Sequence, residues 1–263
     1  MKIALIQLNA GPDKKKNLDG ALRFVLEAVR RKAEFILLPE LFNYRGPAHP
    51  QNGYAHVAES IPGDSTLPLM LFARAHHVFI LAGSVYEKIK GSKKVFNTSV
   101  LINDKGKIIA KYRKNNLFKA RVDGETIDES RFLSAGSSLA VAKIRDFKVG
   151  LSICYDLRFP EIYQKYARRG ADIMCVPSSF TKTTGQAHWE VLLRARAIEN
   201  RCYVLAPNQC GKSGRGVMTF GHSVIIDSWG RILAEASGEK EKVTYSIINI
   251  QNLRRVRKIL PLR

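Results

Sequence analysis

Apolar residues along the chain follow two periods, and segments of the two kinds alternate from one end to the other. Near the N-terminus the spacing is three or four positions, which is typical of an amphipathic helix with one face packed on a sheet. The residues that set this spacing are Leu18, Ala21, Leu22, Val25, Leu26 and Val29. Further helices are predicted at residues 67–76, 161–169, 188–200 and 252–260.

Short apolar or alternating runs between these segments predict β-strands. Residues 98–102 and 108–112 flank an Asp-Lys-Gly turn and are typical of a β-hairpin. Helices interspersed with strands indicate an α/β fold with helices packed outside the sheets. No Pro-, Ser- or Gly-rich linker divides the chain, so we expect one domain over residues 1–263. The other strands are predicted at residues 2–9, 35–38, 78–85, 139–144, 149–153, 173–176, 203–207, 221–226, 232–236 and 243–248.

Composition narrows the class of protein. The chain has 263 residues, of which 45% are hydrophobic and 25% charged, and this balance excludes disordered, collagen-like and coiled-coil protein. At this length about 70 to 75% of the unfolded chain's surface can be buried, so the core needs no disulfide or metal. No pair of cysteines has the spacing of a zinc or redox motif, so we expect free thiols and no metal or other cofactor. The cysteines are Cys154, Cys175, Cys202 and Cys210.

The charge is strongly basic. There are 43 Lys and Arg against 23 Asp and Glu, a formal net charge of +20. Such an excess permits attraction to nucleic acid, to anionic membrane or to an acidic substrate. The basic residues are scattered in short clusters without a long basic arm, so we expect no specific nucleic-acid partner. The apolar run 3–8 is too short for a secretory signal, and no stretch approaches a membrane helix, so we expect a cytoplasmic protein.

Three residues that could carry chemistry stand where predicted strands end. Glu40 follows the apolar run 35–38, although a carboxylate at a strand end is more often a cap or an ion-pair partner. Lys114 follows the second hairpin strand, where a solvated amine is the ordinary alternative. Cys154 lies at a strand-to-helix turn that can expose its sulfur, whereas Cys175 fits a buried apolar position.

In these motifs the sequence resembles the nitrilase-like carbon-nitrogen hydrolases, essentially from end to end. The family's Glu-Lys-Cys triad is matched by Glu40 in Leu-Pro-Glu-Leu-Phe, Lys114 in Tyr-Arg-Lys and Cys154 in Ile-Cys-Tyr-Asp-Leu-Arg-Phe-Pro-Glu. Glu129 falls where the family carries a second carboxylate that holds the catalytic lysine. Three motifs in the family's order are a strong signal where each alone is weak.

The resemblance assigns a role to each group. Cys154 attacks the carbonyl carbon, Glu40 takes the thiol proton, and the Lys114 ammonium with the N–H of Tyr155 stabilises the oxyanion. A thiol with an unperturbed pKa of ~8.5 is already a few per cent ionised at neutral pH, so full ionisation gains only about 30-fold. Positioning and oxyanion stabilisation must therefore supply most of the rate enhancement.

The residues after the nucleophile narrow the resemblance to one branch. Tyr155 and Asp156 stand where nitrilases usually carry Trp-Glu, which favours amide over nitrile substrates. Residues 156–161 and 184–199 look like the branch of deaminated-glutathione amidase and ω-amidase. This implies a metal-independent amidase that acts on a small carboxylate-bearing substrate such as deaminated glutathione, through a cysteine thioester and with ammonia release. The alternatives are an ω-amidase acting on α-keto acid amides, an N-carbamoyl amidohydrolase, and a basic nucleic-acid or anionic-surface binder on an inactive hydrolase scaffold.

Arg158, four residues beyond the nucleophile, is a candidate for substrate binding. A guanidinium can hold a carboxylate through two parallel hydrogen bonds, and the open alternative is an ion pair with Glu161 or another surface acid. Two departures from the family, Asn116 in place of His and Lys119 in place of an acid, predict an altered pocket wall and charge. By resemblance the other substrate-binding candidates are Tyr155, Phe180, Thr181 and Thr184.

The resemblance also implies the architecture. Family members form a four-layer α-β-β-α sandwich and pair through helices flanking the nucleophile into an eight-layer dimer, so we expect a homodimer or larger homo-oligomer. The corresponding helices here are residues 161–169 and 188–200. The sequence ends at residue 263, short of the C-terminal arm that many relatives use across a subunit interface, which leaves the size of the oligomer open.

Overall fold

Two sheets form the centre of the molecule. The structure is a computed structural model and describes residues 1–122 and 125–261. The first sheet has three neighbouring parallel strands, β1, β2 and β3, with antiparallel strands on either side. Its order is β17 (Lys242–Ile247), β1 (Lys2–Gln7), β2 (Phe35–Leu37), β3 (Phe79–Leu81), β5 (Val95–Ile102) and β4 (Val85–Lys88), with β6 (Ile108–Arg113) also paired to β5.

The second sheet repeats this plan around three parallel strands, β10, β11 and β12. Its order is β16 (Ile232–Glu235), β15 (Val224–Ile226), β12 (Tyr203–Ala206), β11 (Ile173–Cys175), β10 (Phe147–Leu151) and β9 (Val141–Ile144). Two small hairpins stand apart from both sheets: β7 (Lys119–Val122) with β8 (Glu125–Asp128), and β13 (Cys210–Lys212) with β14 (Met218–Phe220).

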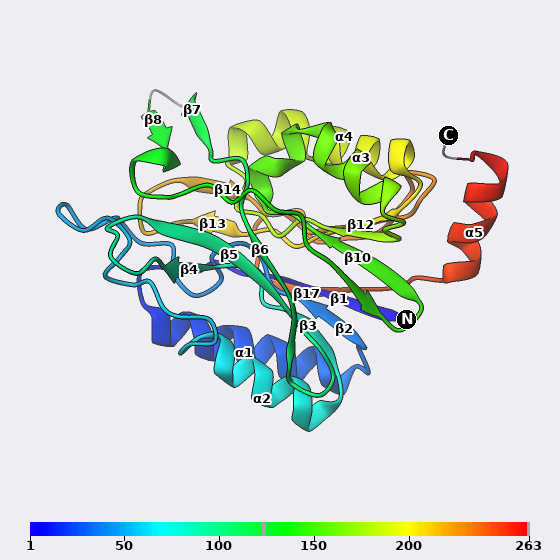
Figure 1. Cartoon of the computed structure of the whole chain (residues 1–263), viewed down its shortest axis with the longest axis horizontal. Coiled ribbons are helices and arrows are strands. Elements are labelled where there is room, and N and C mark those ends of the chain that lie inside the picture. Colours follow the sequence, from blue (N-terminus) through cyan, green and yellow to red (C-terminus); the bar gives the residue numbers. More distant parts are fainter. Residues whose placement is uncertain (123–124, 262–263) are drawn as a thin grey trace.

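Helices cover the outer faces of both sheets. In Figure 1, α1 (Lys14–Arg30) and α2 (Thr66–His76) lie below the first sheet, and α3 (Pro160–Arg168) and α4 (Lys182–Asn200) lie above the second. The C-terminal α5 (Ile250–Ile259) extends at one end. The predicted α-β-β-α sandwich is therefore confirmed, and the homodimer and the single-domain assignment stay predictions. In the described ranges, no helix is both long enough and apolar enough to cross a membrane.

Strands of the first sheet are buried on both faces because each face has its own apolar partner. Ile3 and Leu5 belong to the cluster between the two sheets, whereas Ala4 and Ile6 belong to the cluster under α1 and α2. Successive strand residues point to opposite faces, so an unbroken apolar run is what a doubly covered strand requires. The helix predicted from period-four spacing is α1, and its Ala21, Val25 and Ala28 fill the outer cluster.

Several boundaries differ from the prediction. The strand expected at 78–85 is two strands, because Gly83 turns the chain with a φ of 26° directly against the carbonyl of Pro39. Helix α4 begins at Lys182, six residues earlier than expected, since Thr181 caps it by accepting a hydrogen bond from Thr184 N at 3.4 Å. Strands β7 and β8 lie outside the predicted strands, and the strand expected at 221–226 begins at Val224.

Candidate active site

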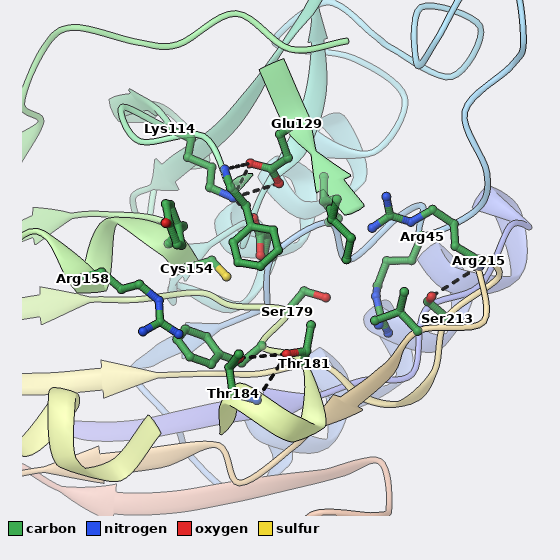
Figure 2. Close-up of a pocket in the computed structure, with 17 residues that line it drawn as sticks. Arg45, Lys114, Glu129, Cys154, Arg158, Ser179, Thr181, Thr184, Ser213 and Arg215 are labelled. Carbon is green, nitrogen blue, oxygen red and sulfur yellow. Dashed lines mark hydrogen bonds and ion pairs between the residues drawn. The ribbon is translucent and has the colours of Figure 1, made fainter. Parts of the chain in front are cut away.

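Ends of strands from both sheets converge on one pocket. Glu40 comes three residues after β2, Lys114 directly after β6 and Cys154 three residues after β10. Residues 179–181, which follow β11, complete this part of the lining. Figure 2 shows the Lys114 and Glu129 side chains meeting above the Cys154 sulfur. The groups are far apart in sequence and come together because the ends of β2 and β6 in the first sheet face the ends of β10 and β11 in the second.

The Lys114 ammonium lies between two carboxylates. Its Nζ is 3.0 Å from Glu40 Oε1 and 2.9 Å from Glu129 Oε2. Lys114 is 1% exposed and Glu40 2%, so little water screens the contacts. Glu129 is itself oriented by the N–H of Phe118, which donates to its Oε2 at 2.7 Å. One buried cation thus holds two acids in fixed positions.

The Glu40 segment is fixed by contacts with other loops. Asn97 Nδ2 donates to Glu40 Oε1 at 2.8 Å, and Gln209 Nε2 donates to the Glu40 carbonyl at 2.9 Å. Leu41, with φ at 51°, donates its N–H to Ser84 Oγ at 2.9 Å. A Cβ on Gly83 would lie 1.8 Å from the Pro39 oxygen, so only glycine permits this close approach of the two chains.

Cys154 occupies a tight turn at the start of a 3-10 helix, Cys154–Arg158. Its φ is 47°, a left-handed conformation that costs a non-glycine residue roughly 1 kcal/mol or more. The turn is held by the Cys154 N–H, which donates to the Pro177 carbonyl at 3.0 Å. It is also held by Asp156, whose Oδ2 accepts hydrogen bonds from Ile153 N at 2.9 Å and Tyr112 OH at 2.7 Å.

The environment sets the protonation of the thiol and the amine. Burial, with the negative charge of Glu40, raises the pKa of the Cys154 thiol well above its ordinary value, although the Lys114 charge and the Ser179 N–H act in the other direction. The resting group is therefore a thiol with the Glu40 carboxylate acting on it. Burial also opposes the Lys114 ammonium, but Glu129 and Glu40 outweigh it and hold the pKa of Lys114 well above its usual range.

The raised pKa changes the expected contribution of the base Glu40. For a thiol with an unperturbed pKa, full ionisation would raise the rate only about 30-fold. With the pKa of Cys154 raised, direct proton transfer to Glu40 becomes more important for attack. The pKa of Glu129 is also raised, mainly by burial, while the Lys114 charge acts to lower it.

The structure brings every predicted site residue to this pocket. The cavity volume of the pocket is about 60 Å³ for the centre of a water-sized sphere, within about 620 Å³ of space that includes open solvent at its mouth. Within it, the hydroxyls of Thr181 and Thr184 are 2.8 Å apart. The predicted residues among its lining are Glu40, Lys114, Glu129, Cys154, Tyr155, Arg158, Phe180, Thr181 and Thr184.

The alternatives for Arg158 are now separated. Its guanidinium faces the pocket, lies over the rings of Tyr155 and Phe180, and approaches His188 Nδ1 at 3.3 Å. Within residues 1–122 and 125–261 the partners of the Arg158 guanidinium are His188, Tyr155 and Phe180, and it forms no ion pair with Glu161. Arg158 is thus free to meet an anion that enters the pocket.

The expectation for the two departures from the family is wrong. Asn116 is not part of the pocket wall: its backbone N–H and its side-chain amide both donate to Asp156 Oδ1 at 2.9 Å. Lys119 has a side chain 74% exposed and pairs with Asp128 at 3.4 Å on the β7–β8 hairpin. Asn116 therefore supports the nucleophile turn from behind, and Lys119 is a surface residue.

Sequence reasoning missed two arginines of the pocket, Arg45 and Arg215. Arg45 comes five residues after Glu40, and Arg215 lies in the glycine-rich turn between β13 and β14. Nothing local distinguishes them from the other basic residues of the chain. In the described ranges, the four cysteines are free and no group of side chains could hold a metal ion.

Comparison with known proteins gives concordant results. The carbon-nitrogen hydrolase family model matches residues 2–258. Omega-amidase NIT2 of Mus musculus is 37% identical over 262 residues, 99% of this chain and 93% of the mouse protein. The structure of Saccharomyces cerevisiae Nit3, a member of branch 10 of the nitrilase superfamily, is similar with a TM-score of 0.87 and 31% identity, covering 100% of this chain and 94% of Nit3.

A third likeness concerns the cysteine. A variant of the amidase from Nesterenkonia sp. AN1, with the acetamide moiety of fluoroacetamide added covalently at its active-site cysteine, has a TM-score of 0.82 and 26% identity. That match covers 97% of this chain and 95% of the amidase. These likenesses define an α-β-β-α protein of the nitrilase superfamily. The chain belongs to the carbon-nitrogen hydrolase family, and it is an enzyme that hydrolyses carbon–nitrogen bonds.

Proposed function

We propose that this enzyme hydrolyses the linear amide of a small carboxylate-bearing substrate through a thioester on Cys154. The observation that carries the proposal is the buried contact of one thiol, one ammonium and two carboxylates in a single pocket. An amide carbonyl is a poor electrophile, so its hydrolysis needs a nucleophile, a base and a donor to the oxyanion. Cys154, Glu40 and Lys114 have the chemistry and the positions for these three tasks.

In the first step the Cys154 sulfur attacks the amide carbon as its proton passes to Glu40. The oxygen that becomes negative is stabilised by the Lys114 ammonium and by the N–H of Tyr155, which belongs to the first turn of the 3-10 helix. Glu40 returns the proton to the leaving nitrogen as the C–N bond breaks. The amine departs neutral and the acyl group stays on sulfur as a thioester.

In the second step Glu40, again ionised, takes a proton from water, and the hydroxide attacks the thioester carbon. The C–S bond breaks, the proton returns to sulfur, and the carboxylic acid product leaves. The balance is one water consumed for one amide cleaved, and it needs no oxidant or reductant. Glu129 acts only through Lys114, so we propose it as a positioning residue.

We infer that the acyl part of the substrate carries a carboxylate bound by Arg158. Support comes from a guanidinium that faces the pocket and has no acid partner among the described residues, and from relatives named omega-amidases. An ω-amide of an α-keto acid would release ammonia. Deaminated glutathione, the other candidate, contains secondary amides, so its cleavage releases a peptide amine and needs a different assay.

The test compares ammonia release from succinamate, which has one carboxylate, with release from neutral butyramide. We expect wild type to hydrolyse succinamate faster, and Cys154→Ala to lower kcat/KM by about 10⁴-fold or more. Cys202→Ala is the matched control, because Cys202 is a buried free cysteine outside the pocket. Unchanged activity in Cys154→Ala, with circular dichroism showing an intact fold, would contradict the proposal.

The substrate carboxylate has its own variant. Arg158→Ala should raise KM for succinamate about 10-fold or more while changing KM for butyramide little, because only the anion uses the guanidinium. Equal effects on both amides would remove Arg158 from recognition. Carbon dioxide released together with ammonia from an N-carbamoyl amino acid would instead indicate a carbamoylase. Salt-sensitive nucleic-acid binding retained in Cys154→Ala, without any hydrolysis, would favour the binder.

We also propose a homodimer formed through the helices that flank the nucleophile. Val191 is 69% exposed and Ile198 46% exposed, and their spacing of seven residues places these two apolar side chains on the same face of α4, where the partner helix would cover them. Gel filtration at micromolar concentration should give twice the chain mass or more. A monomer at that concentration would contradict this assembly.

A further inference from the structure

Three guanidinium groups line the pocket, and those of Arg45 and Arg215 lie apart from Arg158. Figure 2 shows Arg158 on one side of Cys154 and the two others on the opposite side. The lining side chains include four cations, Arg45, Lys114, Arg158 and Arg215, but only two carboxylates. The pocket therefore has a formal excess of two positive charges, which a dianionic ligand would neutralise.

Arg45 is buried without a counter-ion among the described residues. It is 5% exposed, and its Nη atoms donate at 3.3 Å to Gln209 Oε1 and Thr219 Oγ1, which are neutral. Burial, together with the charge of Arg215, lowers the pKa of Arg45 to about 10, although the charge of Glu40 acts in the other direction. Buried guanidiniums are normally paired with acids, because isolated charge is costly to remove from water. The positive charges of Arg45 and Arg215 therefore repel each other.

The backbone holds the two arginines in place. The Gly214 N–H donates to the Arg45 carbonyl at 3.0 Å, and the Arg45 N–H donates to the Gly11 carbonyl at 2.9 Å. Arg215 Nη1 donates to Tyr54 OH at 3.1 Å, and among the described residues the Arg215 guanidinium forms no ion pair, although the charge of Glu129 acts on it. Loops from the two halves of the chain thus bring the buried Arg45 and the exposed Arg215 to the same side of the pocket.

The position of Arg45 and Arg215 relative to Glu40 indicates which part of a substrate reaches these two arginines. Glu40 and Arg45 lie on the same segment after β2, and the Glu40 charge acts on Arg45. In the proposed mechanism Glu40 protonates the leaving nitrogen, so the leaving amine is directed toward Arg45 and Arg215. The acyl group lies on the other side, toward Arg158.

We propose that Arg45 and Arg215 form a subsite for a carboxylate on the amine side of the scissile amide. This inference rests on the proposed amidase function and sharpens its substrate class: an amide flanked by two carboxylates, whose amine product is itself an anion-bearing amine. Two guanidiniums offer several parallel donors to one carboxylate. A primary ω-amide leaves the subsite empty, whereas a deaminated peptide with a free C-terminus fills it.

The test uses N-succinylglycine, which has a carboxylate on each side of its amide, and the same compound with its glycine carboxylate methylated. Glycine or its ester is measured as the released amine, and ammonia release from succinamate is measured in parallel. We expect wild type to prefer the dicarboxylate over the methyl ester by about 10- to 100-fold in kcat/KM. Arg215→Gln should reduce that ratio about 10-fold.

Two further variants keep the result interpretable. Lys212→Gln removes an exposed charge from the same hairpin without touching the pocket, and it should leave the ratio unchanged. Arg45→Met should reduce the ratio like Arg215→Gln. If Arg45→Met does not fold, the subsite is tested with Arg215→Gln alone. Calorimetry then compares the binding of N-succinylglycine to Cys154→Ala with its binding to the Cys154→Ala, Arg215→Gln double variant, and the subsite predicts weaker binding to the double variant.

The outcomes separate the two proposals. Hydrolysis of succinamate by wild type, with no preference for N-succinylglycine over its ester, overturns the subsite and leaves the amidase function standing. A ratio that Arg215→Gln does not alter also overturns it. If wild type hydrolyses neither succinamate nor N-succinylglycine while Cys154→Ala behaves identically, the amidase function fails and the subsite fails with it.

Discussion

Arg113 and Lys114 are neighbours in sequence, yet they belong to two ionic clusters with opposite ratios of acids to cations. Arg113 holds Glu87 through two contacts of 2.8 Å, and Lys111 adds a third at 3.0 Å, so one acid meets two cations. Lys114 is one cation between two acids, Glu40 and Glu129. Successive residues at the end of β6 point in opposite directions, which sends one to the sheet's partly exposed side and the other into the pocket.

The difference in burial decides what each cluster can do. The side chains of Lys111 and Arg113 are 41% and 39% exposed, whereas that of Lys114 is 1% exposed. Hydrogen bonds from Arg113, Thr98 and Lys111 lower the pKa of Glu87 to about 2 despite its own burial, so this acid is ionised and satisfied. The buried cluster keeps the Lys114 ammonium charged beside the Cys154 thiol, as a donor to an oxyanion requires.

The largest difference is expected when the cation is removed from each cluster. Lys114→Met takes away the proposed oxyanion donor and leaves two buried carboxylates unpaired, so kcat/KM for succinamate should fall about 10²- to 10³-fold. Lys111→Met is the control from the other cluster and should change kcat/KM by less than about twofold. Steady-state kinetics decide: more than a tenth of the activity in Lys114→Met rules out this donor.

A smaller effect is expected from the second acid of the buried cluster. Glu129→Gln keeps an acceptor for the Phe118 N–H but removes a negative charge beside Lys114. The pKa of Lys114 should fall, kcat should decrease about 10-fold, and the alkaline limb of the kcat profile should move to lower pH. If the variant loses thermal stability with an unshifted pH profile, Glu129 has a structural role only.

The smallest effect on activity is expected in the Glu87 cluster. Glu87→Gln should lower the free energy of unfolding by about 1–2 kcal/mol at pH 7, since solvent screens the partly exposed cations, with kcat changed less than about twofold. The folded-state pKa of about 2 lies below the ordinary 4.5, so the contribution is present above pH 4.5 and is lost as pH falls toward 2. Urea titrations at pH 7 and pH 3 measure it, and a difference that does not shrink at pH 3 would contradict this account.

The sequence predicted the alternation of strands and helices because doubly covered strands and amphipathic helices have distinct apolar periods. It misplaced the start of α4, since residues 182–187 carry no apolar period and the helix begins at the Thr181 cap. It also missed the β7–β8 and β13–β14 hairpins, whose strands have only three or four residues and lie outside the main sheets. Short polar strands depend on tertiary partners that a local pattern does not contain.

The candidate site also contains residues that the sequence predicted and residues whose place depends on distant partners. Glu40, Lys114 and Cys154 were found because each sits in a characteristic run at a strand end, and the motifs reinforce one another. Asn116 was misassigned because its partner, Asp156, is 40 residues away.

The chain alone determined the order of its elements, because local spacing encodes it, and its motifs pointed to the candidate reactive groups through their resemblance to a known family. Folding decided the raised pKa of Cys154, the charged state of Lys114 and the placement of Arg45 and Arg215, 170 positions apart, in one pocket. Those properties depend on burial and on the sum of nearby charges, and both arise only when distant segments exclude water together.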